Sequence, residues 1–140
     1  MRVVLDTNIA ISGLLWRGAP RRVINAAIDG QIELFSSVEL LDELEEVLQR
    51  PKLAARLGQI GKTSAELVDE YGALVAIVAA DPLVAPVSTD PDDDAVLACA
   101  LAARAEAIVS GDDDLLTLQV FQAIPILTAS AFLMRLAPAG

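Results

Sequence analysis

The sequence predicts one α/β domain of three layers, in which helices cover both faces of a mainly parallel central sheet. Short apolar segments alternate along the chain with longer segments whose apolar residues recur every three or four positions. This alternation is typical of parallel sheets, because a helix usually connects one parallel strand to the next. The chain has 140 residues, of which 54% are hydrophobic, so we expect a single domain over residues 1–140.

The predicted strands are short and largely apolar, as expected of strands that are buried on both faces. In chain order they are residues 2–5, 32–35, 107–110 and 124–127. Residues 83–87 contain a proline, so they are predicted to be a weak edge strand or a connector.

The predicted helices fill the intervals between the strands. They cover residues 9–15, 19–30, 37–50, 52–57, 64–78, 92–104, 112–118 and 130–136. Proline in the first turn favours the helix that begins at residue 19. The other starts are marked by residues that cap helices well: Ser36 with Glu39 three positions later, Ser64, Asp92 or Asp93, and Ser130.

Composition narrows the classes of function. The net charge of -10 argues against broad, non-specific binding to nucleic acid. No apolar run has the length of a membrane span and no signal peptide precedes the first strand, so we expect a cytoplasmic protein without a membrane partner. The single cysteine, Cys99, is expected to be a buried thiol. The cations gather in two groups, which are either solvated helix faces or two basic rims beside an acidic pocket: Arg17, Arg21 and Arg22, then Arg50, Lys52, Arg56 and Lys62.

Carboxylates stand at four places where an apolar strand ends or where an apolar helix has its edge. These places are Asp6, Glu43, the run 90–94 and the run 112–114. In an open α/β sheet, ligands bind outside the carboxyl ends of the strands, so these acids should converge. The chain has no histidine, and converging carboxylates are oxygen ligands suited to a hard cation such as Mg²⁺ or Mn²⁺. Such a site polarises phosphoryl oxygens and activates water for phosphodiester hydrolysis.

Each acid also has a purely structural interpretation. Asp6 could be only a helix N-cap. Glu43 and Glu45 lie at the two edges of one apolar helix stripe, and periodicity does not choose between them. In the run 90–94, Asp94 lies closest to the apolar helix face, whereas Asp92 and Asp93 are expected to be caps.

In the run 112–114, alternation places Asp112 and Asp114 on one side and leaves Asp113 on the other. A turn followed by a helix cap would also explain this run. Any single cluster could have a purely structural role. The occurrence of all four together favours one shared site.

Taken together, these segments resemble the PIN-domain nucleases over nearly the whole chain. Residues 3–8 are similar to the opening strand and acid of that family, and Ser37 with residues 40–44 to the helix with its second acid. Residues 93–100 are similar to the third acid and its helix, and residues 109–115 to the fourth. The resemblance implies a PIN-like fold and a metal-dependent endoribonuclease. Such proteins are often the toxin of a bacterial toxin–antitoxin pair and usually dimeric, so an RNA substrate, a second copy and an antitoxin protein are the implied partners.

The resemblance also implies roles for individual residues. Glu43 is selected over Glu45, and the catalytic set becomes Asp6, Glu43, Asp94 and Asp112. One or two Mg²⁺ or Mn²⁺ ions would be held by Asp6, Asp94, Asp112 and Asp114, with support from Thr7, Asn8 and Ser110. Asp93 competes with Asp94 for the third position. RNA phosphates would lie along Arg17, Arg21, Arg22, Arg50, Lys52 and Arg56. On this basis Asp6→Asn and Asp94→Asn are both expected to abolish cleavage.

Two other functions fit parts of the same pattern. A Mg²⁺-dependent phosphatase could use Asp6 as a nucleophile, although Asn8 stands where an Asp-x-Asp pair would need its second acid. A non-catalytic protein-binding module could keep the fold and use its apolar surface for a partner. Trapping of a phospho-aspartate would favour the first, and metal-independent partner binding without cleavage would favour the second.

Overall fold

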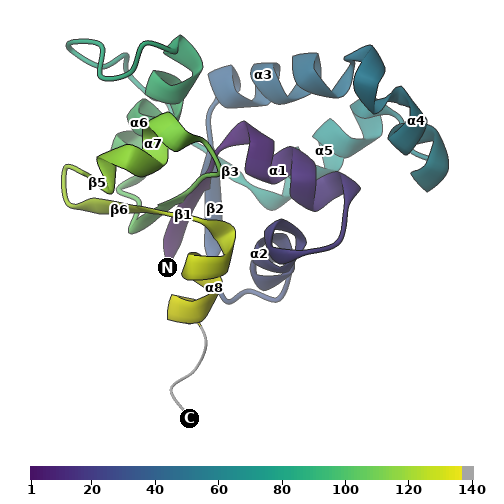
Figure 1. The fold of residues 1–140 in the computed structure, drawn as a ribbon, viewed down its shortest axis with the longest axis horizontal. Helices are drawn as coiled ribbons and strands as arrows, with labels where there is room; N and C mark the ends of the chain where they lie inside the picture. Colours follow the sequence, from purple (N-terminus) through teal and green to yellow (C-terminus); the bar gives the residue numbers. More distant parts are fainter. Residues whose placement is uncertain (137–140) are drawn as a thin grey trace.

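In the computed structural model, which describes residues 1–136, a mainly parallel sheet lies between layers of helices (Figure 1). Within these residues the sheet has six strands in the order β3-β2-β1-β4-β6-β5, and only the β5–β6 pair is antiparallel. The strands are β1 (Arg2–Leu5), β2 (Glu33–Ser36), β3 (Ala76–Ile77), β4 (Ala107–Val109), β5 (Val120–Phe121) and β6 (Ile124–Leu127). The predicted α/β class with a mainly parallel sheet is confirmed.

Helices connect the strands and cover the sheet. They are α1 (Thr7–Leu15), α2 (Ala19–Ile28), α3 (Val38–Leu48), α4 (Pro51–Ile60), α5 (Ser64–Leu74), α6 (Pro91–Ala103), α7 (Asp113–Leu118) and α8 (Ala129–Leu136). In residues 1–136, no helix has the length and apolar character needed to cross a membrane.

Two apolar clusters, one on each face of the sheet, form the core. Val3 and Leu5 of β1 face the cluster that includes α1, α2, α3, α5 and α8. Val4 points the other way, into the cluster that contains the apolar residues of α6 and Leu115 of α7. Successive strand residues point to opposite faces, so a short, wholly apolar strand serves both clusters at once.

The strand order places a reversal of the chain path between β1 and β4. The connections from β1 through β2 to β3 build the sheet in one direction, and β4 then adds on the other side of β1. Residues 3–5 pair with residues 107–109, and the Asp6 N–H continues this pairing by donating to the Val109 carbonyl oxygen at 2.9 Å. At such a switch point the loops after the two strands diverge and leave a crevice suited to ligands.

The sheet edge beyond β2 differs from the prediction. The helix expected to reach Val78 ends at Leu74, and residues 76–77 form β3 beside β2. Val75 and Val78 continue the helical apolar spacing, but the open edge of β2 offers hydrogen-bond partners, and the Val78 N–H donates to the Ser36 carbonyl oxygen at 2.9 Å. Residues 83–87, the predicted edge strand or connector, form no strand.

The hairpin of β5 and β6 was not predicted in full. Its turn residues, Gln122 and Ala123, both have positive φ, at 45° and 68°. Such turns normally carry glycine or asparagine, so the sequence lacks the usual hairpin signal here.

Several helix caps lie beside the predicted residue. The observed caps are Ser37, Thr63, Asp90 and Thr128, in place of Ser36, Ser64, Asp92 or Asp93, and Ser130. In each case suitable cap residues stand close together. The residue that caps is the one just before the first helical turn, and for Ser37, Thr63 and Asp90 its backbone is extended.

Candidate metal centre

Asp6 is the most buried of the four predicted catalytic acids. It follows β1, is only 5% exposed, and occupies the N-cap position of α1. Its side chain makes no capping hydrogen bond. Instead Oδ2 accepts a hydrogen bond of 2.8 Å from the Ser110 hydroxyl, which follows β4. A cap role alone therefore does not account for the Asp6 carboxylate, which is also tied to the end of β4.

Ser110 links two acids that follow neighbouring strands, Asp6 after β1 and Asp112 after β4. Its side chain is fully buried, and its Oγ accepts a hydrogen bond of 3.0 Å from the Asp112 N–H. With this acceptor position used, the hydroxyl hydrogen is directed toward Asp6. Ser110 thus holds one oxygen of Asp6 and leaves the other available.

Burial and like charge act on Asp6 together. Burial raises the pKa of Asp6, and the Asp112 carboxylate raises it further, while the Ser110 hydroxyl and the N–H groups of Thr7 and Asn8 oppose the shift. Thr7 is buried and Asn8 is exposed. A carboxylate kept in such a place without a cation partner is costly, so the environment favours either a proton or a bound cation.

Asp93, from the first turn of α6, brings a second buried acid to the same place. It is 4% exposed, and its Oδ2 accepts a hydrogen bond of 3.1 Å from the Ser88 hydroxyl. Burial raises the pKa of Asp93 to about 6, against the hydrogen bond from Ser88 and together with the charges of Asp112, Asp90 and Asp6.

Asp93, Asp112 and Asp114 form a set that could hold a metal ion. Each offers one carboxylate oxygen, and these oxygens all lie within 4.8 Å of one another. The Asp112 side chain is also the N-cap of α7, where its Oδ1 accepts from the N–H groups of Asp114 at 2.8 Å and Leu115 at 3.3 Å. Asp113 is exposed and lies outside this set.

Glu43 faces the acidic site from α3, whereas Glu45 is exposed. Burial raises the pKa of Glu43 to about 7. Thr7 opposes this shift, and Asp92 and Asp6 add to it. These neighbours place Glu43 at the edge of the site, on the side of α1 and the start of α6.

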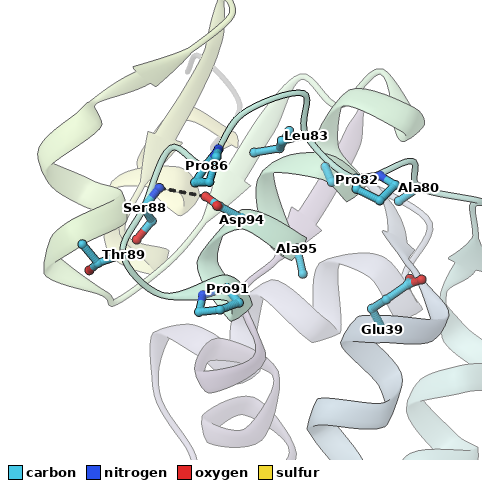
Figure 2. A pocket seen from close by; sticks show the side chains of 11 residues that line it. Glu39, Ala80, Pro82, Leu83, Pro86, Ser88, Thr89, Pro91, Asp94 and Ala95 are labelled. Carbon is cyan, nitrogen blue, oxygen red and sulfur yellow. Dashed lines mark hydrogen bonds between the residues drawn. The ribbon is translucent and has the colours of Figure 1, made fainter.

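Asp94 has a different environment from the other predicted acids. Its Oδ1 accepts a hydrogen bond of 2.8 Å from the Ser88 N–H (Figure 2). Both of its oxygens also lie 3.3 Å from the Val87 nitrogen. It lines a cavity between α6 and the loop of residues 78–90. The structure therefore brings Asp93, and not Asp94, together with Asp112 and Asp114.

The reason for this difference is the start of α6. The Asp90 side chain caps the helix through the Asp92 N–H at 2.9 Å, so Pro91 begins the helix and Asp93 becomes a helical residue that points inward. From the sequence, Asp92 and Asp93 are expected to be caps, which leaves Asp94 as the preferred ligand. Sequence reasoning also missed Ser88, because a lone serine in a loop carries no periodic or spacing signal.

The predicted RNA-binding residues divide into two kinds. Arg56 is tied to the fold, since its Nε donates to the Leu15 carbonyl oxygen at 2.7 Å and its guanidinium lies 5.8 Å from the Trp16 ring centre. Arg21 donates to the Gly13 carbonyl oxygen at 3.5 Å. The remaining predicted RNA-binding residues are exposed: Arg17, Arg22, Arg50 and Lys52.

The raised pKa values predict that the metal-free protein loses stability as pH rises. Asp93 and Glu43 stay protonated in the folded chain up to about pH 6 and 7, whereas the unfolded chain releases these protons nearer pH 4. The folded state therefore binds more protons across this window, so its free energy of unfolding falls from about pH 4 to pH 7. In EDTA, the melting temperature should be lower at pH 8 than at pH 5.

A matched variant tests whether these two acids cause the trend. Asp93→Asn combined with Glu43→Gln should show a smaller fall in melting temperature between pH 5 and pH 8. A wild-type melting temperature that rises over this interval would contradict the assignment of these two acids.

These residues fit a divalent cation. The donors are all carboxylate oxygens, the type that Mg²⁺ and Mn²⁺ prefer, and they come from three segments that the fold brings to one crevice. The crowding of like charges is the conflict that a cation would remove.

Comparison with known proteins agrees with this geometry. A family model described as PIN domain matches residues 2–114. One similar solved chain comes from the crystal structure of VapBC2 from Rickettsia felis bound to a DNA fragment from their promoter. The two chains share 13% sequence identity with a TM-score of 0.59, over 90% of this chain and 97% of the other, which shows a common fold. No curated protein matches the chain.

Proposed function

Because the chain belongs to the PIN-domain family, we propose that it is a metal-dependent endoribonuclease that hydrolyses RNA phosphodiester bonds at the acidic crevice. The observation that carries the proposal is the set of Asp93, Asp112 and Asp114 oxygens within 4.8 Å, beside the buried Asp6. In this proposal Asp93 takes the third ligand position that the sequence analysis gave to Asp94.

In the proposed reaction, four of the acids hold the metal and Glu43 accepts a proton. Asp6, Asp93, Asp112 and Asp114 would hold one or two Mg²⁺ or Mn²⁺ ions. A bound ion would polarise a phosphoryl oxygen and lower the pKa of a bound water. Ser110 fixes one oxygen of Asp6 through its 2.8 Å hydrogen bond and so sets the direction of the other.

Glu43 is suited to accept a proton from the attacking water. In the metal-free chain, burial raises its pKa to about 7, near the neutral pH at which a general base is most effective. When Glu43 is ionised, one of its carboxylate oxygens would take the proton. This role needs no histidine, and the chain has none.

The RNA would lie along α1. The acidic site is at the first residues of α1, and the exposed Arg17 follows its last turn. Arg50 and Lys52 stand at the start of α4, which contacts α1. A helix of this length spans roughly 14 Å, at about 1.5 Å per residue. Phosphates held by these cations would therefore place a neighbouring phosphodiester at the acids. Arg56 would contribute indirectly, by holding the end of α1 in place. Its guanidinium packs on Trp16 and donates a hydrogen bond to the Leu15 carbonyl oxygen.

We also propose that the protein is the toxin of a toxin–antitoxin pair. Support comes from its resemblance to ribonuclease toxins and from the structural neighbour, which belongs to the VapBC2 crystal structure. The partner would then be an antitoxin protein. A small open reading frame next to the gene, whose product blocks cleavage, would test this role.

A second copy of the chain would cover the apolar surface of α1, α2 and α5. Ile28 is 57% exposed there, beside a groove of about 280 Å³ whose lining includes Leu14, Ile24 and Leu74. A homodimer is the commonest way to cover such a surface. Light scattering at micromolar concentration should give the mass of a dimer. A monomeric wild-type chain, or a dimer whose mass is unchanged in the Ile28→Asp variant, would contradict the proposed interface.

Cleavage of a structured RNA tests the proposed activity. Mg²⁺ or Mn²⁺ should support cleavage, EDTA should abolish it, and either cation should raise the melting temperature because it binds the folded chain. Cleavage that persists in EDTA would contradict the mechanism.

A further inference from the structure

The side chains of Asp93 and Asp94 are adjacent in α6 but contact different parts of the molecule. Asp93 is buried and belongs to the acidic set, whereas Asp94 is half-buried and faces the loop of residues 78–90 (Figure 2). Ser88 is the residue that touches both. Its N–H donates to Asp94 Oδ1 at 2.8 Å, and its hydroxyl donates to Asp93 Oδ2 at 3.1 Å.

The hydroxyl of Ser88 has a fixed direction. Its Oγ accepts a hydrogen bond of 3.2 Å from the Asp90 N–H, so its hydrogen is left for Asp93. Ser110 has the same arrangement on the other side of the crevice, where it accepts from the Asp112 N–H and donates to Asp6 Oδ2. Two serines thus each hold one oxygen of a buried acid.

Asp94 fixes the backbone that carries Ser88. Its carboxylate accepts hydrogen bonds from the backbone N–H groups of both Val87 and Ser88. The neighbouring loop residues Pro82, Leu83 and Pro86 line a cavity of about 460 Å³ next to α6. Without Asp94, the Ser88 hydroxyl would lose its fixed distance from Asp93.

We propose that Ser88 is a positioning residue for the metal ligand Asp93, and that Asp94 acts through Ser88 by anchoring the loop. This inference rests on the proposed function, because it assigns Ser88 and Asp94 to the same cation site. Groups that orient metal ligands commonly change metal affinity by about 10- to 100-fold when removed.

The test is Mn²⁺ binding to the full chain, measured by isothermal titration calorimetry. Ser88→Ala should raise the Mn²⁺ dissociation constant by about tenfold, and so should Asp94→Ala. Ser88→Thr keeps the hydroxyl and Asp94→Asn keeps one acceptor oxygen, so both should stay close to wild type. Thr89→Ala, at the exposed neighbouring position, is the matched control and should bind as wild type does.

Two further measurements separate positioning from a merely structural role. The double variant Ser88→Ala/Asp94→Ala should bind Mn²⁺ no more weakly than either single variant. Both changes disrupt the same chain of contacts, from Asp94 through Ser88 to Asp93. In RNA cleavage, Ser88→Ala should lower kcat and leave KM unchanged. Additive losses in the double variant would overturn the inference, because Asp94 would then act independently of Ser88.

The outcomes also distinguish this inference from the proposed function. If Asp93→Asn removes Mn²⁺ binding but Ser88→Ala binds like wild type, the inference alone is overturned. The same holds if Ser88→Ala only lowers the metal-free melting temperature. If the wild-type chain binds no Mn²⁺, the proposed function fails and this inference fails with it.

Discussion

Asp6→Asn is expected to reduce RNA cleavage by about a thousandfold or more, as the loss of one member of a catalytic set does in other hydrolases. Asparagine has nearly the same shape and keeps one oxygen to accept the 2.8 Å hydrogen bond from Ser110. It removes the negative charge that a divalent cation needs. Multiple-turnover cleavage of a structured RNA in Mn²⁺ would measure the effect.

The same variant should be as stable as wild type without metal, or more stable. Burial and the nearby Asp112 raise the pKa of Asp6, so its charge is unfavourable when no cation is present. Asp113→Asn is the control and should remain active, because Asp113 is exposed and outside the acidic set. Full activity in Asp6→Asn would mean that the active site lies elsewhere.

Asp93→Asn is expected to reduce cleavage as strongly as Asp6→Asn, whereas Asp94→Asn should keep most of the activity. Asp93 lies in the acidic set, where burial, together with the charges of nearby acids, raises its pKa to about 6. Asp94 accepts hydrogen bonds from the loop backbone, which one amide oxygen can still accept. Cleavage rates of the two variants, compared at saturating Mn²⁺, provide the measurement.

This pair reverses the expectation that the sequence supports. From helical spacing, Asp94 lies nearer the apolar face and is the preferred ligand. Loss of cleavage in Asp94→Asn together with an active Asp93→Asn would restore the sequence-based assignment, and the positions of Ser88 and Asp94 would need another explanation.

Much of the fold follows from local patterns. The apolar run of β1 and the alternation of strands and helices predict a parallel sheet, and its topology then places Asp6 and Asp112 at one edge. The pattern does not predict β3, because residues 75–78 keep a helical spacing that the open edge of β2 overrides. Nor does it predict β5, whose turn uses Gln122 and Ala123 at positive φ.

The candidate site was predictable to the level of acidic clusters and not to the level of each acid. Glu43 points toward Thr7 and Asp6 as the family resemblance implies, although periodicity left Glu45 as an equal choice. The choice between Asp93 and Asp94 depends on which aspartate caps α6. Several adjacent aspartates are all good cap residues, so residue spacing does not show which of them is the cap. Ser88 acts through a loop contact that no local pattern records.

Anomalous diffraction from crystals grown with Mn²⁺ would test the central claim most directly, since it locates the ion itself. The account predicts a peak in the crevice between β1 and β4, within coordination distance of carboxylate oxygens of Asp93 and Asp112, with Asp6 alongside. A peak bound by Asp94 on the cavity side of α6, or an empty crevice at millimolar Mn²⁺, would contradict it.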